Sequence, residues 1–449
     1  MKKINISNLS EVFGAAPERN SNELHKIIKD QIKLIKPEKE IIDSLKKLSG
    51  EFIGVLNKEL ATGKINAEAF IGGSFARDTL IKGKTYDVDI FVRFDWRYEN
   101  ISPMLENVLK KACKETNLKL EKIHGSRDYF RVHSDGNRGY LEIVPVTKIK
   151  KPQEERNVTD LSYFHVPYVK RKIKGLEDQV RVAKLFCKAQ KVYGAETYVK
   201  GFSGYTLELL VIYYKSFVKM LRELMKVKSD ERLVIDIEKH YKKRDEVFIH
   251  MNESKLHSPV ILIDPTYKER NALAALSRET FEKFQESAGR FLKSPSKKFF
   301  EPQEIDVEKM IAEAKRKNAE FLRVEIETDK QEGDIAGTKL KKFAGTLTDE
   351  LDKYFFAARK EFEYNGMKKA DLYLILKSRK EVVRIGPPLH LKKFVNAFKK
   401  EHMDTYEKNG IIHARIKINF TARSYIDVWV KANRKMVGDM GIVRVGVLG

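Results

Sequence analysis

The sequence predicts an α+β protein built from several domains. Its 449 residues exceed what one compact core normally holds, so we expect two to four domains. Segments with apolar residues at helical spacing take turns along the chain with short segments that alternate as strands do. Apolar residues make up 42% of the chain, which is enough for several cores. No run of about 18 apolar residues occurs and no apolar segment follows Met1, so we expect neither a transmembrane span nor a secretory signal.

The charge of the chain points to a polyanionic partner. Lys and Arg total 87 against 64 acidic residues, a formal charge of +23. Such an excess favours nucleic acid or an anionic membrane, and the lack of a membrane segment weakens the second choice. The two cysteines, Cys113 and Cys187, have neither the spacing of a zinc site nor that of a disulfide framework. We therefore expect a protein of the reducing cytoplasm that binds no membrane.

The first expected domain, residues 1–150, combines helices with a small sheet. Residues 22–61 have helical spacing, and Pro37 is expected to divide them into two helices. Strands are predicted at "AEAFIGGSFA" and "DVDIFVRF", followed by a helix over 103–116. "YFRVHS" and "GYLEIVPV" then predict a hairpin around the turn "DGNRG". This order predicts a mixed sheet with helices packed on it.

Three further domains are expected after the first. Residues 151–296 are mainly helical, and "KSPSKKFFEP" is typical of a linker. Residues 297–388 contain the strand "FLRVEIETD", a long helix "TKLKKFAGTLTDELDKYFFAARKEFEYNG", and the strands "KADLYLILKS" and "EVVRIGPP". That β-α-β-β order resembles part of the ferredoxin-like fold, which many RNA-binding modules use. Residues 389–449 predict a helix followed by the strands "IIHARIKINF" and "YIDVWVKA".

The stretch "GGSFARDTLIKGKTYDVDIFV" carries the residues that point to chemistry. Asp87 and Asp89 should project from one face of a strand, because side chains two apart share a face. Two unpaired carboxylates so close repel each other, and a divalent cation such as Mg²⁺ removes the conflict. The preceding Gly72, Gly73 and Ser74 let backbone N–H groups approach an anion closely. Together these features predict a site for a nucleoside triphosphate and its magnesium.

A third carboxylate is expected on a neighbouring strand, because two metal ions about 4 Å apart need more than two ligands. Glu142 in "GYLEIVPV" fits this place by its alternation with apolar neighbours. Two simpler interpretations stay open here: Glu142 is an ordinary solvent-facing residue, and Asp87 and Asp89 lie on the wet face of an edge strand. Short motifs of this kind need structural context before they count as sites.

Beyond these residues, the chain resembles a known family, the archaeal-type (class I) CCA-adding enzymes, which are tRNA nucleotidyltransferases. "IGGS" and "YDVDI" match the nucleotidyltransferase pattern hG[GS]…Dh[DE]h. "SYFHVPYVKRKIKG", "RVAKLFCKAQKVYGAETYVKGFSGYTLELLV" and "IDPTYKERNALAALS" resemble the family's central segments in the same order. The resemblance implies a polymerase-beta-like nucleotidyltransferase head at 1–150 and a helical neck at 151–296 that completes the nucleotide pocket. It also implies a ferredoxin-like or RRM-like body at 297–388 and a tRNA-binding tail at 389–449.

The resemblance also implies roles for individual residues. Asp87, Asp89 and Glu142 would be catalytic and would bind two Mg²⁺ ions, although the family often has Glu then Asp in the strand motif and Asp on the third strand. The expected nucleotide-binding residues are Gly73, Ser74, Arg77, Ser162, His165, Lys184, Tyr193 and Arg270. Ser74 and Arg77 would hold the triphosphate, and Arg270 would read the base of CTP or ATP. Structural roles stay open for three others: His165 as a helix cap, Lys184 on a charged helix face, and Tyr193 in a core.

The implied reaction is the template-independent addition of C, C and A to the 3′ end of a tRNA that lacks all or part of its CCA. The RNA 3′-hydroxyl would attack the α-phosphate of CTP or ATP and release pyrophosphate. The basic residues expected to follow the tRNA backbone are Lys170, Arg171, Lys172, Lys392, Lys393 and Arg415. Phe394 or Tyr406 could add stacking, and a solvated charged face is the simpler interpretation of each patch. A homodimer is one assembly that the sequence leaves open.

Two other functions compete with this interpretation. Another ribonucleotidyltransferase, such as a poly(A) polymerase or an oligoadenylate synthetase, would share the catalytic core. The segments "FSGYTLELL" and "DPTYKERN", which resemble the CCA-adding group, argue against it. A catalytically inactive RNA-binding relative is the second alternative, and the presence of Asp87, Asp89 and Glu142 argues against lost chemistry.

Overall fold

The computed structural model describes residues 19–134 and 139–448, which fall into two compact units. The first unit comprises the described residues up to 195 together with 199–303, and the second comprises 196–198 and the described residues from 304 onward. Both units combine helices with sheets, so the expected α+β architecture is confirmed. None of the helices in the described ranges is long and apolar enough to cross a membrane.

The N-terminal part of the first unit is a five-stranded mixed sheet covered by helices on one face. Its elements are α2 (Arg19–Ile35), α3 (Lys39–Thr62), β1 (Ala67–Ile71), α4 (Gly73–Ala76), β2 (Tyr86–Phe94), α5 (Ile101–Thr116), β3 (Lys119–Ile123), β4 (Tyr129–His133) and β5 (Gly139–Thr147). The strand order is β1-β2-β5-β4-β3, in which only β2 and β5 run parallel. Helices α3 and α5 bury their apolar residues against Val88, Ile90, Leu141 and Ile143 of the two central strands.

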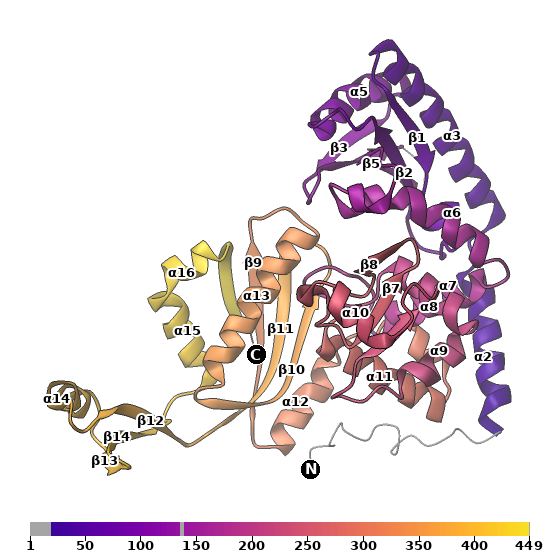
Figure 1. Cartoon of the computed structure of the whole chain (residues 1–449). Helices are drawn as coiled ribbons and strands as arrows, with labels where there is room; N and C mark the ends of the chain where they lie inside the picture. Colours follow the sequence, from indigo (N-terminus) through magenta and orange to yellow (C-terminus); the bar gives the residue numbers. More distant parts are fainter. Residues whose placement is uncertain (1–18, 135–138, 449) are drawn as a thin grey trace. The chain divides into compact units, whose positions relative to one another are not determined.

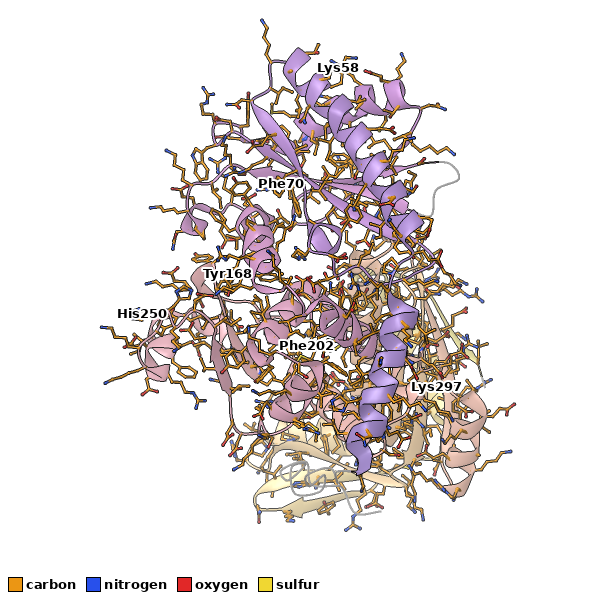
Figure 2. The ribbon with its side chains drawn as sticks, turned by 90° about the vertical axis from the view of Figure 1, so that its right-hand side faces the viewer. Lys58, Phe70, Tyr168, Phe202, His250 and Lys297 are labelled. Atoms are coloured by element: carbon orange, nitrogen blue, oxygen red, sulfur yellow. The ribbon has the colours of Figure 1, made fainter. Side chains whose placement is uncertain are left out.

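Several details of this part follow the sequence predictions. The chain leaves helix at residues 36–38, as Pro37 predicts, and the expected strands pair as a mixed sheet. Strands β4 and β5 pair antiparallel, as a hairpin requires, whereas residues 135–138 of its predicted turn lie outside the described residues. Helix α2 does not belong to the sheet's core: its Leu24 and Ile28 pack with the helical part that follows. Figure 2 shows this lower N-terminal helix beside the region of Phe202.

The helical part of the first unit surrounds a cluster of phenylalanines. Its elements are the 3₁₀ helices η2 (Pro152–Glu154), η3 (Val158–Leu161), η4 (Glu253–Lys255) and η5 (Lys297–Phe300), the helices α6 (Ser162–Lys172), α7 (Glu177–Ala189), α8 (Gly204–Tyr214), α9 (Phe217–Leu224), α10 (Arg244–His250) and α11 (Arg278–Lys293), and the strands β6 (Leu233–Asp236), β7 (Val260–Asp264) and β8 (Tyr267–Asn271). Phe186 has no exposed surface and contacts the rings of Phe217, Phe284, Phe291 and Phe300. The small sheet β6-β7-β8 is a feature that the sequence analysis missed.

The second unit contains a four-stranded antiparallel sheet with the order β10-β11-β9-β15. Its elements are α12 (Val307–Arg316), β9 (Glu320–Thr328), α13 (Asp334–Leu351), β10 (Phe355–Tyr364), β11 (Lys369–Ser378), α15 (Ala422–Ala432), α16 (Arg434–Asp439) and β15 (Ile442–Leu448). Figure 1 shows α13 crossing this sheet, and its Leu340, Phe343 and Leu347 pack against Val324 and Leu374. The β-α-β-β order of this sheet is β9, α13, β10 and β11, whereas the sequence predicts "KADLYLILKS" and "EVVRIGPP" as its last two strands; the second of these is β12 (Glu381–Pro388), which belongs to another sheet.

A small lobe is inserted between β11 and α15. It consists of β12 (Glu381–Pro388), α14 (Lys392–Glu401), β13 (Thr405–Lys408) and β14 (Ile411–Lys417), with the strand order β12-β14-β13. The chain enters and leaves the lobe at adjacent points, because the Ile418 N–H donates to the Lys380 carbonyl at 2.8 Å. The expected boundary at 388 falls inside the lobe, and the larger sheet takes strands from both sides of it. The division into four domains stays a prediction.

Two secondary-structure predictions in the second unit are wrong. The end of the predicted long helix is β10, because residues 355–364 pair with β11 along nearly their whole length and this pairing outweighs their helical composition. "YIDVWVKA" lies in helix α15 instead of a strand. The Thr421 hydroxyl caps α15 by accepting from the Ser424 N–H, and Ala422 and Ile426, four residues apart, are its buried residues. Helical spacing therefore decides this segment, although it also alternates.

Candidate active site

Three carboxylates start from neighbouring positions on one face of the mixed sheet. Asp87 and Asp89 alternate on β2 with Val88 and Ile90, which are fully buried. Glu142 lies directly beside Asp89 in the register of the parallel strands β2 and β5. Neighbouring strands lie about 4.8 Å apart, so the backbone brings the three acidic residues together. The face opposite α3 and α5 is therefore acidic at this end of the sheet.

The electrostatics of this face favour a cation. The pKa of Asp89 is raised to about 7, mainly by burial and also by the charges of Asp87 and Glu142, whereas Arg77 and Lys184 oppose the shift. Burial and the charge of Asp87 also raise the pKa of Glu142, although Arg131 opposes them. The charge of Asp87 therefore makes ionisation of Asp89 and Glu142 less favourable, and Glu142 has the same effect on Asp89. A bound positive charge would reverse this effect.

The residues fit a divalent cation in their chemistry, but their side chains are not yet arranged around one. Carboxylate oxygens are the ligands that Mg²⁺ prefers. In this structure the Glu142 Oε2 accepts a hydrogen bond from the Arg131 Nε at 3.4 Å. Across residues 19–134 and 139–448, no three or more Asp, Glu, His or Cys side chains are grouped so as to hold one ion. The strand positions thus suit a metal site, and Glu142 is engaged elsewhere.

The glycine turn and Asp89 form one structural unit. The Gly72 N–H donates to the Asp89 carbonyl at 2.8 Å, and Gly73 has a φ of +58°. A Cβ on Gly73 would lie only 1.5 Å from the Asp89 Oδ2. Glycine is therefore required for two reasons, its left-handed backbone and the carboxylate packed against it. Ser74 follows in α4, where its carbonyl accepts from the Thr79 N–H at 2.9 Å.

Glu208 gathers the cations beside this turn. Its Oε2 lies 2.7 Å from the Arg77 Nε, and its Oε1 lies 3.2 Å from the Lys184 Nζ. The Thr79 hydroxyl donates to the same Oε1 at 2.6 Å. The structure thus brings together Arg77 and Lys184, two of the predicted nucleotide-binding residues, on a fully buried carboxylate. Sequence reasoning missed Glu208, and its signal was a single acidic residue within the apolar run "LELLVI".

A second buried carboxylate, Asp264, organises another pair of predicted residues. Its Oδ2 lies 3.0 Å from the His165 Nε2 and accepts from the Arg270 Nη1 at 2.6 Å. The Tyr205 hydroxyl donates to Oδ1 at 3.1 Å, and the Tyr205 ring stacks on His165 with centroids 4.1 Å apart. Burial raises the pKa of Asp264, but His165 and Arg270 together hold it well below its usual range. Sequence reasoning missed Asp264 and Tyr205.

His165 is buried in this second cluster. Burial lowers its pKa, while the hydrogen bond and the charge of Asp264 oppose the shift. Its interaction with Asp264 explains why a histidine is found inside the helical part, and the predicted cap role does not apply, because His165 lies within α6. Ser162 is the first residue of the same helix and is half-buried.

Tyr193 lies close to Lys184. A Cβ on Gly204 would be 3.0 Å from the Tyr193 hydroxyl and 3.6 Å from the Lys184 Nζ. The Lys188 Nζ lies 4.9 Å from the centre of the Tyr193 ring. The ring itself packs against the core of the helical part. Tyr193 therefore combines a packing role with a hydroxyl beside the cation cluster.

The predicted RNA-binding residues lie on α6 in the first unit and on α14 and β14 in the lobe. Lys170, Arg171 and Lys172 form the last turn of α6, where the Lys172 Nζ is 2.8 Å from the Glu238 Oε1. Lys392 and Lys393 are exposed at the start of α14. Arg415 on β14 is exposed, and its guanidinium lies 4.8 Å from the centre of the Tyr406 ring. Arg415 and Tyr406 thus present a basic and aromatic surface on the lobe.

Comparison with known proteins identifies both parts of the first unit. The family model "Nucleotidyltransferase domain" matches residues 53–198, and "tRNA nucleotidyltransferase, second domain" matches residues 178–301. The CCA-adding enzyme of Nanoarchaeum equitans is 35% identical over 374 residues, which cover 81% of this chain and 87% of that protein. The CCA-adding enzyme of Methanosarcina mazei is 28% identical over 74% of this chain and 71% of its own length. The CCA-adding enzyme of Thermococcus gammatolerans is 27% identical over 86% of this chain and 84% of its own length.

Replacement of Gly73 by alanine should destabilise the first unit. The new methyl group would collide with the Asp89 carboxylate, and alanine is strained at a positive φ. We expect the free energy of unfolding to fall by about 2–4 kcal/mol in chemical denaturation. Gly54→Ala is the matched control, because Gly54 lies within α3 with nothing near its added Cβ. This control should stabilise the chain by about 0.5–1 kcal/mol, and equal stability of Gly73→Ala and the unsubstituted protein would contradict the packing described.

Removal of the Asp87 charge should lower the pKa of Asp89. Because the pKa of Asp89 is raised from 3.8 to about 7 in the folded chain, its contribution to stability is full below pH 3.8 and is lost as the pH rises through about 7. Asp87→Asn removes one repelling charge, so this loss should shift to lower pH. Carboxyl ¹³C NMR titration of the metal-free protein measures the midpoint. Asp43→Asn, at an exposed site on α3, is the control and should leave the midpoint of the Asp89 titration unchanged. An unchanged midpoint in Asp87→Asn would contradict the interaction between Asp87 and Asp89.

Proposed function

The chain belongs to the CCA-adding enzymes, the tRNA nucleotidyltransferases that complete the 3′ end of tRNA, and from this premise we propose how its residues perform the reaction. The observation that carries the proposal is the pairing of Asp89 with Glu142 on parallel strands, with Asp87 on the same face and the Gly73 turn packed against Asp89. A nucleoside triphosphate needs such acidic oxygens for its metal ions and cations for its phosphates. The acidic oxygens and the cations both lie around the Gly73 turn.

The proposed substrates are CTP, ATP and a tRNA that lacks all or part of its CCA. The 3′-hydroxyl oxygen of the RNA forms a bond to the α-phosphorus while the bond from that phosphorus to the bridging oxygen of the β-phosphate breaks. The hydroxyl loses its proton and pyrophosphate leaves. Little covalent chemistry is required of the protein, so positioning and charge neutralisation supply most of the rate.

Asp87, Asp89 and Glu142 would hold two Mg²⁺ ions. When bound, the ions neutralise the triphosphate and favour loss of the proton from the RNA hydroxyl. The raised pKa of Asp89 supports this role, because a carboxyl with a pKa of about 7 keeps part of its protonation near neutral pH until a cation displaces the proton. Glu142 would exchange its hydrogen bond with Arg131 for the ion.

The triphosphate would lie along the turn that follows β1. The backbone N–H groups of Gly73 and Ser74 and the Arg77 guanidinium are suited to phosphate oxygens, and the Lys184 ammonium would add a point charge. Arg77 and Lys184 are held on Glu208, so they meet the substrate in fixed positions. Ser162, His165 and Tyr193 would complete the pocket for the phosphates and sugar.

Arg270 would read the base. Its guanidinium can donate to the O2 and N3 acceptors of cytosine, whereas adenine presents a different pattern. Asp264 supports this role, because it accepts from the Arg270 Nη1 and leaves the other donors of the fork for a ligand. His165 and Tyr205 line the same carboxylate, which limits how far the arginine can turn.

The tRNA would be held mainly through its phosphates. The formal charge of +23 supports a salt-dependent, sequence-independent contact. Lys170, Arg171, Lys172, Lys392, Lys393 and Arg415 are the proposed contacts, with Phe394, which is 60% exposed, and Tyr406 as stacking partners. A location in the cytoplasm and assembly into a homodimer stay predictions.

The product formed on truncated tRNA tests the reaction. With a tRNA that lacks its last three nucleotides, we expect CTP alone to add two residues and ATP then to add one. Asp89→Ala should lower the rate of addition by more than about 10²-fold, because a ligand of the reacting phosphate's metal is lost. Separation of the products on a sequencing gel measures both the number of nucleotides added and the rate of addition. A long A tail would instead identify a poly(A) polymerase, and no addition together with retained RNA binding would identify an inactive relative.

Arg270→Ala should blur the choice between CTP and ATP. Loss of a well-oriented pair of hydrogen bonds to a base reduces discrimination by about tenfold or more. The ratio of kcat/KM for CTP and ATP on a tRNA ending at each step measures this, with tRNA affinity as the second readout. An equal loss for both nucleotides would contradict the role in base reading.

A further inference from the structure

Glu208 is an acidic residue within an otherwise apolar part of α8. The residues on both sides of it, from Thr206 to Ile212, are buried, and Glu208 has no exposed surface. An unpaired carboxylate in such a place costs several kcal/mol. An apolar residue at this position would avoid the free-energy cost of burying a carboxylate. The partners of Glu208 therefore indicate the reason for an acidic residue here.

The partners come from two separate stretches of the chain. Arg77 and Thr79 belong to the turn after α4, and Lys184 belongs to α7. Arg77 uses Oε2 at 2.7 Å, while the Thr79 hydroxyl at 2.6 Å and the Lys184 Nζ at 3.2 Å use Oε1. The Lys184 Nζ also lies 2.9 Å from the Thr79 Oγ1. Both oxygens of the carboxylate are thus engaged.

The backbone of the turn is also held by contacts that do not involve Glu208. Arg181, on α7 and 2% exposed, donates to the carbonyl of Asp78 at 2.6 Å and to that of Leu80 at 2.9 Å. These bonds fasten the backbone on both sides of Thr79. What Glu208 adds is control of two side chains, those of Arg77 and Lys184.

Charge explains why that control is needed. Arg77 and Lys184 repel each other, and burial lowers the pKa of Lys184, which favours its neutral form. Burial would raise the pKa of Glu208, but Arg77 and Lys184 lower it, so the carboxylate is ionised between them. Both cations also act on Asp89, which places the group beside the acidic face.

We propose that Glu208 is a positioning residue for the nucleotide: it holds the Arg77 guanidinium and the Lys184 ammonium in the geometry in which they receive the triphosphate. The inference rests on the proposed function, in which these two cations contact phosphate. Glu208 itself touches no substrate. Its effect should therefore pass through Arg77 and Lys184 and should disappear when they are absent.

A double-mutant cycle tests this dependence. Glu208→Gln should raise the KM for CTP in a single addition by about tenfold, with a smaller change in kcat, because binding of the nucleotide is what the cations support. In an Arg77→Ala background the same substitution should raise KM by less than about threefold. Fully additive effects would overturn the proposal. Glu286→Gln, at an exposed position of α11, is the control and should change neither constant.

Two further measurements separate the causes of failure. If Arg77→Ala itself leaves the KM for CTP unchanged, the phosphate role under the proposed function fails, independently of Glu208. If Glu208→Gln does not fold, as thermal denaturation will show, Thr79→Val replaces it, because it removes one donor to the carboxylate together with the contact of the Thr79 Oγ1 with the Lys184 Nζ. Thr79→Val should raise KM by about threefold without loss of fold, and an unchanged KM would overturn the proposal.

Discussion

The repulsion among carboxylates on one face of a sheet is the constraint on which the site depends. The parallel pairing of β2 and β5 places Asp89 beside Glu142, and alternation places Asp87 on the same face. Such a face is unfavourable for an isolated chain, because each charge opposes the ionisation of the next. The chain tolerates it through Gly73, which gives Asp89 room, and through nearby cations. This is the usual conflict between stability and function at a site that must bind a multivalent cation.

Buried acids organise the cationic side of the same site. Glu208 and Asp264 are both fully buried, and each forms an ion pair with an arginine and accepts a hydrogen bond from a hydroxyl. In each case a flexible, strongly charged side chain is held by a buried acid. A preformed arrangement of cations loses less entropy when a polyanion binds than a set of mobile lysines would.

Sequence reasoning found the parts of the site that depend on local spacing and missed those that depend on tertiary contact. The alternation around Asp87 and Asp89 and the glycine turn are visible within twenty residues. Glu208, by contrast, accepts a hydrogen bond from Thr79, which is 129 positions away in the sequence, and the residues next to Glu208 do not indicate this partner. The same limit explains β10, whose helical composition is overridden by pairing with β11, and α15, where apolar residues fit both periods. The sequence thus predicted the mixed sheet and its acidic residues, but not the acids that hold the cations.

The lobe of β12, α14, β13 and β14 leaves the larger sheet and returns to it at one place, where Ile418 meets Lys380. An insertion whose two ends are adjacent leaves the flanking elements free to pair with each other, whether the inserted segment is long or short. Strand β15 can complete its sheet without any contribution from the strands of the lobe. The lobe can therefore vary in length while the four-stranded sheet that supports it stays the same.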